Sequence, residues 1–125
     1  MAAHTPERPP QVLVVEDELL LALDIVQLLR KLGCEAVGPA PSVSRAQELI
    51  DEARPDFALL DVNLGGERST AVAETLRALD VPYALATGYG AEQLPEPALR
   101  DAPRVTKPLT LDALRALLDA HLHGG

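Results

Sequence analysis

The stretch Phe57-Ala58-Leu59-Leu60-Asp61 decides the fold. A short apolar run that follows the turn Arg54-Pro55-Asp56 is typical of a strand buried on both faces of a parallel sheet. Asp61 ends this run, and Val62-Asn63-Leu64-Gly65-Gly66 opens a loop behind it. Ligands of open α/β sheets bind beyond the carboxyl ends of the strands, so Asp61 stands where a ligand site is expected.

Four more short segments have the character of strands, and amphipathic segments separate them. The pattern predicts strands at 11–15, 35–38, 57–60, 83–86 and 104–106. It predicts helices from just after Glu18 to Leu32, at 43–53, at 69–79 and at 111–121. Their predicted local features are N-caps at Ser42 and Thr110, a C-cap glycine at Gly33, and a third helix whose inward face is Ala71, Val72, Leu76 and Leu79.

Prolines at 95, 97 and 103 restrict the fourth helix to a short segment, either Glu92–Leu94 or Pro97–Asp101. Strands that alternate with helices predict an α/β fold, a doubly wound parallel sheet with helices on both faces. The flavodoxin-like strand order 2-1-3-4-5 fits five strands in a chain of 125 residues. We expect a disordered leader at 1–10, one domain at 11–122 and a tail at 123–125.

Composition excludes several classes of protein. The formal net charge of −8 comes from 19 acidic and 11 basic residues, with no basic stripe, which argues against direct binding to DNA. The one cysteine, Cys34, cannot form an intrachain disulfide and is expected to be buried. No signal peptide is visible, and no apolar run approaches the ~20 residues that span a bilayer. A cytoplasmic protein is the expectation.

Strands one and three are neighbours in the expected order, which brings the acidic pair Glu16-Asp17 close to Asp61. Like charges raise one another's pKa, and a divalent cation removes that conflict. A few carboxylate oxygens at loop ends suit Mg²⁺. Zinc is not favoured, because the three histidines lie near the chain ends at His4, His121 and His123.

A carboxylate beside Mg²⁺ can attack a phosphoryl group and form an aspartyl phosphate. Lys107 can neutralise one phosphoryl oxygen, and the Thr87 hydroxyl with nearby backbone N–H groups, that of Gly88 among them, can bind another. Each residue alone also has a structural explanation: an Asp after a strand forms turns or caps, an acidic pair favours a helix N-terminus, and a lysine before a proline is usually solvated. Their shared place at strand ends favours the functional interpretation.

Over about residues 10–122 the chain resembles the receiver domains of two-component response regulators. The matching stretches are Val12-Leu13-Val14-Val15-Glu16-Asp17-Glu18, Pro55-Asp56-Phe57-Ala58-Leu59-Leu60-Asp61-Val62-Asn63-Leu64, Ala86-Thr87-Gly88 and Lys107-Pro108. The resemblance implies that Asp61 accepts a phosphoryl group from a histidine kinase or a phosphotransfer protein. It implies a Mg²⁺ site made by Glu16, Asp17, Asp61 and the Asn63 backbone carbonyl. It also implies that Thr87 is the switch hydroxyl and Lys107 the phosphate partner.

The chain departs from the common pattern at Val105, where receivers usually carry an aromatic switch residue. Leu85-Ala86-Thr87-Gly88-Tyr89-Gly90 resembles instead the FATGUY subgroup, with Leu85 in place of its Phe. That subgroup lacks the strand-five aromatic, has an altered fourth helix and often works with HWE or HisKA-2 kinases. Tyr89 is then a candidate for part of the switch, or a loop tyrosine packed on the surface. Two glycines in this loop suggest unusual dihedrals or close approach of another group.

The leading hypothesis is therefore a signalling phosphoacceptor, not an enzyme in its own right beyond slow self-dephosphorylation. If the chain is complete, it is a stand-alone receiver that binds a partner or acts as a phosphate sink. One alternative is an aspartyl-phosphate-type phosphatase, although such enzymes carry a second Asp where this chain has Asn63. The other is a pseudo-receiver that binds partners without cycling phosphate.

Overall fold

The computed structural model describes residues 8–88 and 94–123. Its main sheet has five parallel strands in the order β2-β1-β3-β6-β7, which confirms the predicted order 2-1-3-4-5. The elements, in chain order, are β1 (Gln11–Val15), α1 (Leu19–Lys31), β2 (Glu35–Ala40), α2 (Val43–Glu52), β3 (Phe57–Asp61), β4 (Asn63–Leu64), β5 (Glu67–Arg68), α3 (Thr70–Ala78), β6 (Tyr83–Thr87), α4 (Pro97–Arg100), β7 (Arg104–Thr106), α5 (Leu111–Leu118) and a π-helical turn (Asp119–His123).

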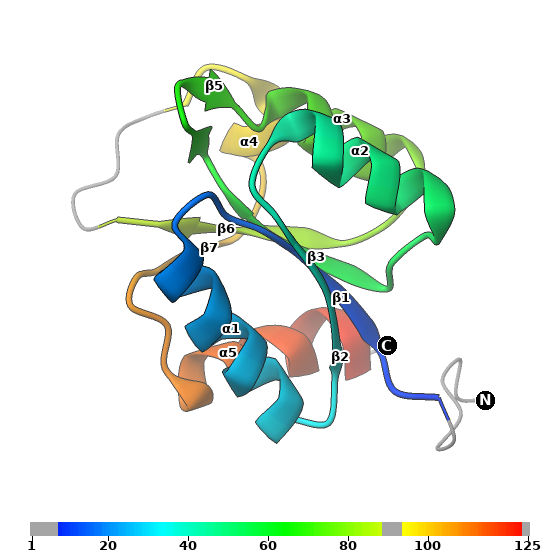
Figure 1. The fold of residues 1–125 in the computed structure, drawn as a ribbon, viewed down its shortest axis with the longest axis vertical. Helices are drawn as coiled ribbons and strands as arrows, with labels where there is room; N and C mark the ends of the chain where they lie inside the picture. The colour runs from blue at the N-terminus through cyan, green and yellow to red at the C-terminus, as the bar shows by residue number, and fades with distance from the viewer. Residues whose placement is uncertain (1–7, 89–93, 124–125) are drawn as a thin grey trace.

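The sheet separates two hydrophobic cores, because alternate residues of each strand point to opposite faces. Helices α2, α3 and α4 cover one face, and α1 and α5 cover the other (Figure 1). In β3, Ala58 and Leu60 pack under the first group of helices, while Phe57 and Leu59 pack under the second. All four residues are at most 1% exposed, as expected for a central strand.

Several predicted local features are confirmed. The Ser42 hydroxyl accepts a hydrogen bond from the Arg45 N–H, and the Thr110 hydroxyl accepts one from the Ala113 N–H, so both residues cap their helices. Gly33 has a φ of +81° just after α1, the left-handed conformation of a helix stop. Cys34 is buried. Of the two positions for the fourth helix, Pro97–Arg100 is helical, and Glu92 lies outside the described residues.

Other predictions are wrong in detail. Strand β2 continues past Gly38 to Ala40, because Gly38 takes a φ of +99° and lets the chain stay paired with β1. On α3, Ala71 is exposed and Leu79 is 37% exposed, whereas Ala73 is buried, so the inward face is rotated from the predicted one. The last α-helix ends at Leu118 and continues as a π-helical turn to His123.

The hairpin that β4 and β5 form after Asp61 was not predicted from the sequence. The segment expected to be an open loop after Asp61 forms two short antiparallel strands, with Leu64 paired to Glu67 and Asn63 paired to Arg68. Gly65 and Gly66 make the turn with φ values of +58° and +99°. A two-residue turn with positive φ at both positions matches the twist of a hairpin, which explains the two glycines. The hairpin begins two residues after Asp61.

Candidate functional site

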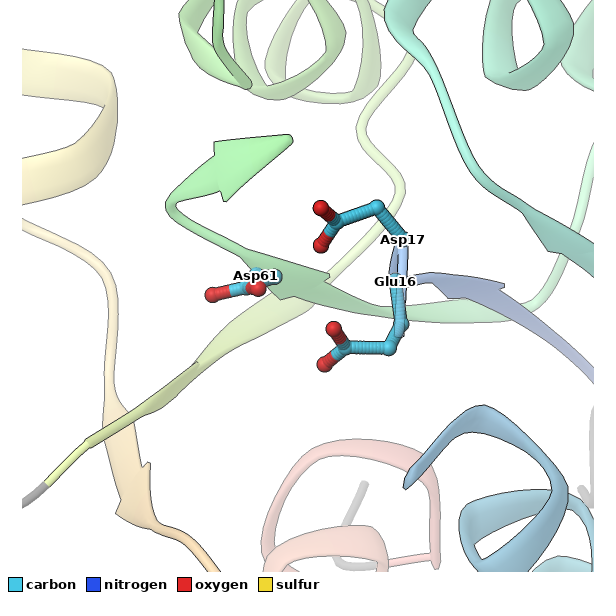
Figure 2. A group of neighbouring side chains, drawn as sticks. All are labelled: Glu16, Asp17 and Asp61. Atoms are coloured by element: carbon cyan, nitrogen blue, oxygen red, sulfur yellow. The ribbon is translucent and has the colours of Figure 1, made fainter. Parts of the chain in front are cut away.

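The acidic residues converge at the carboxyl ends of β1 and β3. The two strands pair in parallel, with Val15 opposite Leu60, so the residues that follow them meet. One carboxylate oxygen each of Glu16, Asp17 and Asp61 lies within 4.8 Å of the others. The side chains of Glu16 and Asp17 leave the chain in opposite directions around Asp61 (Figure 2). Glu16 is buried, Asp61 is half-buried and Asp17 is exposed. The structure thus brings the predicted cluster together.

Lys107 joins the cluster from the carboxyl end of β7, an edge strand that lies on the opposite side of β3 from β1. Its Nζ lies 2.8 Å from Glu16 Oε1 and 3.2 Å from Asp61 Oδ2, and its side chain is 17% exposed. The backbone N–H of Lys107 donates to the Thr87 carbonyl at 2.7 Å, which fixes the lysine at the end of β6 and β7. One ammonium group therefore bridges a buried and a half-buried carboxylate.

The pKa values of Glu16 and Lys107 are both raised. Burial raises the pKa of Glu16 and the charge of Asp61 adds to this, while the hydrogen bonds from Lys107 and from the Glu18 N–H oppose it. Burial acts to lower the pKa of Lys107, but hydrogen bonds and charge from Glu16 and Asp61 outweigh it and raise that pKa. Both shifts favour the protonated form, but for different reasons: burial is the main cause for Glu16, whereas the two carboxylates are the cause for Lys107.

The donor set fits a hard divalent cation. With all three carboxylates ionised, the Lys107 ammonium leaves an excess of two negative charges. The ligand atoms are all oxygens, the set that Mg²⁺ prefers. The hairpin also makes the Asn63 carbonyl available. Leu64 and Glu67 close the two-residue turn, and the Ser69 N–H donates to the Val62 carbonyl, so the intervening Asn63–Arg68 pair falls at a non-hydrogen-bonded position.

Thr87 lies at the edge of the site, one residue beyond Ala86, which pairs with Asp61. Its side chain is buried, and its hydroxyl donates to the Val105 carbonyl at 3.4 Å. The Thr87 hydroxyl therefore points toward the neighbouring strand β7. Val105 itself is half-buried and packs on the core beneath α1 and α5.

The expectation for the glycine loop is wrong at Gly88. Its φ is not positive, and an added Cβ would meet nothing within 4 Å, so neither a left-handed φ nor a close approach of described residues explains the glycine. Tyr89 and Gly90, the other residues of this prediction, lie outside the described residues.

Sequence reasoning missed the polar contacts of the hairpin. Glu67 Oε2 accepts a hydrogen bond from the Val43 N–H at 3.4 Å, at the start of α2. Arg68 Nε donates to Glu96 Oε2 at 2.8 Å, just before α4. The Gly65-Gly66 pair between Leu64 and Glu67 is a recognised hairpin signal and could have predicted the turn. Nothing in the sequence pairs Arg68 with Glu96, which are 28 positions apart.

Comparison with known proteins decides the family. The family model of the response regulator receiver domain matches residues 12–119. The chain belongs to the response regulator receiver family. Receiver domains are signalling modules of two-component systems rather than conventional enzymes, so the family places this receiver in two-component signalling.

Individual relatives agree. The receiver is 33% identical over 95 residues to the transcriptional regulatory protein PdtaR of Mycobacterium tuberculosis, covering 75% of this chain and 46% of PdtaR. It is 34% identical over 95 residues to the phyllosphere-induced regulator PhyR of Methylorubrum extorquens, covering 70% of this chain and 36% of PhyR. The chain therefore spans less than half the length of these curated relatives.

Solved structures give the same fold. The solution structure of SdrG from Sphingomonas melonis is 40% identical, with a TM-score of 0.79, over 91% of this receiver and 97% of SdrG. The receiver domain of PhyR from Erythrobacter litoralis is 29% identical, with a TM-score of 0.81, over 95% of this chain and 94% of that one. Within residues 8–88 and 94–123, no helix has the length and hydrophobicity needed to cross a membrane.

Proposed function

We propose that this receiver accepts a phosphoryl group on Asp61 from the phosphohistidine of a histidine kinase or a phosphotransfer protein. The observation that carries the proposal is the place of the Asp61 carboxylate, 3.2 Å from the Lys107 ammonium and within one cluster with two other carboxylates. In the transfer, an Asp61 oxygen bonds to phosphorus while the phosphorus–nitrogen bond of the donor breaks. The electron pair of that bond stays on the imidazole nitrogen.

Glu16, Asp17, Asp61 and the Asn63 carbonyl would hold Mg²⁺. When bound, the ion supplies positive charge that offsets the carboxylates and the phosphoryl oxygens. Lys107 moves from its ion pair with Asp61 to a phosphoryl oxygen. The Thr87 hydroxyl leaves the Val105 carbonyl for another oxygen, and the Gly88 N–H stands beside it as a further donor.

We place the receiver in the FATGUY subgroup. Support comes from Leu85-Ala86-Thr87-Gly88-Tyr89-Gly90, from Val105 at the usual aromatic position, and from a fourth helix of only four residues. The likeness to SdrG and PhyR is compatible with this assignment. In this proposal the receiver unit is residues 11–122, flanked by a leader at 1–10 and a tail at 123–125, and Tyr89 shares the switch with Thr87.

The expected donor is a kinase of the HWE or HisKA-2 type. A protein donor needs a surface beside Asp61, and α1, which starts two residues after Asp17, exposes three leucines there. Leu19, Leu20 and Leu23 are 64%, 79% and 43% exposed. Apolar residues gathered on one exposed helix turn are typical of interaction sites.

The output is a protein–protein interaction or a phosphate sink. A PhyR structure from Bartonella quintana, 30% identical to this chain, is described as that of an anti-anti-sigma factor. That precedent favours a protein partner over DNA, as does the net charge of −8.

Incubation with Mg²⁺ and acetyl phosphate, followed by intact-mass measurement, tests the proposal. The wild-type protein should gain one phosphoryl group, whereas Asp61→Asn should gain none and EDTA should abolish the gain. No gain with acetyl phosphate or with a phosphorylated kinase favours the pseudo-receiver. Sustained phosphate release from varied phosphate esters favours the phosphatase, which Asn63 in place of a second Asp argues against.

A further inference from the structure

A chain of short contacts connects Asp61 to α4. Asp61 is followed by Val62, whose carbonyl accepts a hydrogen bond of 2.9 Å from the Ser69 N–H. The two neighbours of Ser69 then reach the same carboxylate oxygen. Arg68 Nε lies 2.8 Å from Glu96 Oε2, and Thr70 Oγ1 donates to that oxygen at 3.2 Å. One residue of the α4 segment is therefore held by both ends of the turn that leads from β5 into α3.

Glu96 is the N-cap residue of α4. Its own carbonyl accepts hydrogen bonds from the Leu99 and Arg100 N–H groups at 3.0 and 2.7 Å. A hydrogen bond with its own backbone N–H, and then the charge and hydrogen bonds of Arg68 and Thr70, lower the pKa of the Glu96 carboxyl, while burial opposes them. The carboxylate and the first turn of α4 are thus fixed together.

The α4 segment depends on such anchors. Four residues make one turn, which is far too short to be stable as an isolated helix. Its other attachments include the buried side chains of Ala98 and Leu99, a hydrogen bond from the Tyr83 hydroxyl to the Ala98 carbonyl, and an ion pair of the C-cap residue Asp101 with Arg77. The Glu96 contacts are the ones that connect it to the hairpin beside Asp61.

The anchor is incompletely satisfied. Glu96 Oε1 and Ser69 Oγ are both buried and have no hydrogen-bond partner among the described residues. Buried polar atoms without partners are uncommon and mark places where the chain holds an unfavourable arrangement. Movement of Glu96 into solvent would satisfy its free oxygen. Opening would break the contacts of Glu96 Oε2 with Arg68 and Thr70, but it would expose Glu96 Oε1 to water.

We propose that the Arg68–Glu96 ion pair is a latch that transmits the phosphorylation state of Asp61 to α4. This inference rests on the proposed phosphorylation of Asp61. A phosphoryl group adds bulk and charge at Asp61 and shifts Val62 and the hairpin, which moves Arg68 away from Glu96 and frees the α4 segment. The route runs through β4 and β5, so it does not need an aromatic residue at position 105.

Hydrogen exchange of residues 94–102, measured by mass spectrometry with and without acetyl phosphate and Mg²⁺, tests the latch. In the wild-type protein, phosphorylation should raise the exchange rate of this segment several-fold. Glu96→Ala should raise it before phosphorylation, and phosphorylation should then add no further change. A matched control is Glu48→Ala, which removes an ion pair of 2.9 Å with Arg45 on the exposed face of α2 and should behave as wild type.

The outcomes separate the two proposals. A phosphoryl mass gain with unchanged exchange of residues 94–102 in the wild-type protein overturns the latch and leaves the phosphoacceptor intact. Absence of the mass gain overturns the phosphoacceptor, and the latch with it. If Glu96 were only structural, Glu96→Ala would raise exchange by the same factor in both states and keep the phosphorylation-dependent ratio, which also overturns the latch.

Discussion

At the scale of single residues, Asp17 is the exposed member of an otherwise enclosed acidic cluster. Its proposed role as a metal ligand is testable without any phosphoryl donor. We expect Asp17→Asn to weaken Mg²⁺ binding on the order of 10-fold or more. Loss of a residue that only hydrogen-bonds to a metal ligand already lowers metal affinity by about this factor, and loss of a ligand itself should lower it at least as much. Isothermal titration calorimetry with MgCl₂ measures this directly.

The matched control is Glu18→Gln, one position away. Glu18 contributes its backbone N–H to Glu16 Oε2 at 3.1 Å, a contact that the substitution keeps, and its carboxylate is not part of the cluster. Mg²⁺ affinity should therefore stay within about twofold of wild type, since an exposed charge outside the ligand set acts on the ion only through water and is weakened by salt. Equal weakening in both variants would mean that general surface charge, rather than a ligand at Asp17, attracts the ion.

Residues at the carboxyl ends of the strands were predictable, because the carboxyl ends of parallel strands meet at one edge of the sheet. Glu16, Asp17, Asp61 and Lys107 all follow from strand positions and appear as one cluster. The direction of the Thr87 hydroxyl was not predictable, since it depends on a hydrogen bond to a carbonyl of the neighbouring strand. The role of Glu96 was also not predictable, because its partner Arg68 is 28 positions away in the sequence.

At the scale of elements, Gly33 and Gly38 both have a positive φ, but only Gly38 also lacks space for a side chain. An added Cβ at Gly33 would meet nothing within 4 Å, whereas at Gly38 it would lie 2.8 Å from the Ala40 nitrogen and 3.0 Å from the Val14 carbonyl oxygen. We expect Gly33→Ala to cost about 1 kcal/mol of unfolding free energy from the dihedral alone. Gly38→Ala should cost about 3 kcal/mol, because overpacking against two backbone atoms is added.

Urea unfolding followed by circular dichroism gives both values. Both variants carry the same substitution, so the difference between them reports the steric conflict at Gly38 with the Ala40 nitrogen of β2 and the Val14 carbonyl oxygen of β1. Equal losses of stability would contradict the close approach of backbone atoms at Gly38.

Element boundaries were predicted best where local signals agree. Ser42 and Thr110 combine N-cap chemistry with a following amphipathic segment, and both helices begin where expected. The hairpin failed because strands of two residues carry too little periodicity to detect, although Gly65-Gly66 was a usable turn signal. The inward face of α3 failed at Ala71 and Ala73, because alanine is equally compatible with both environments.

At the scale of the whole molecule, the reactivity of the buried Cys34 thiol measures how often the folded protein unfolds enough to expose it. It is 6% exposed, and burial, with a smaller contribution from the charge of Asp56, raises the pKa of its thiol. A raised pKa keeps an acid protonated to higher pH, and the thiolate is the reactive form. Alkylation by iodoacetamide in native buffer should therefore be much slower than in urea, and its pH midpoint should lie higher than in the denatured chain.

The chain has one cysteine, so the mass gained on alkylation is unambiguous. Similar rates and similar pH midpoints with and without urea would show that Cys34 is accessible in the folded protein. That result would contradict the packing of the core beneath α1 and α5, to which Cys34 belongs.

The central claim is that Asp61, and no other carboxylate of the cluster, carries the phosphoryl group. Borohydride reduction of the acetyl-phosphate-treated protein converts an aspartyl phosphate to homoserine, which peptide mass spectrometry then locates in the chain. The account predicts homoserine at position 61 alone, dependent on Mg²⁺. Reduction at Asp17, a reduced glutamyl residue at Glu16, or no reduced residue at all would contradict it.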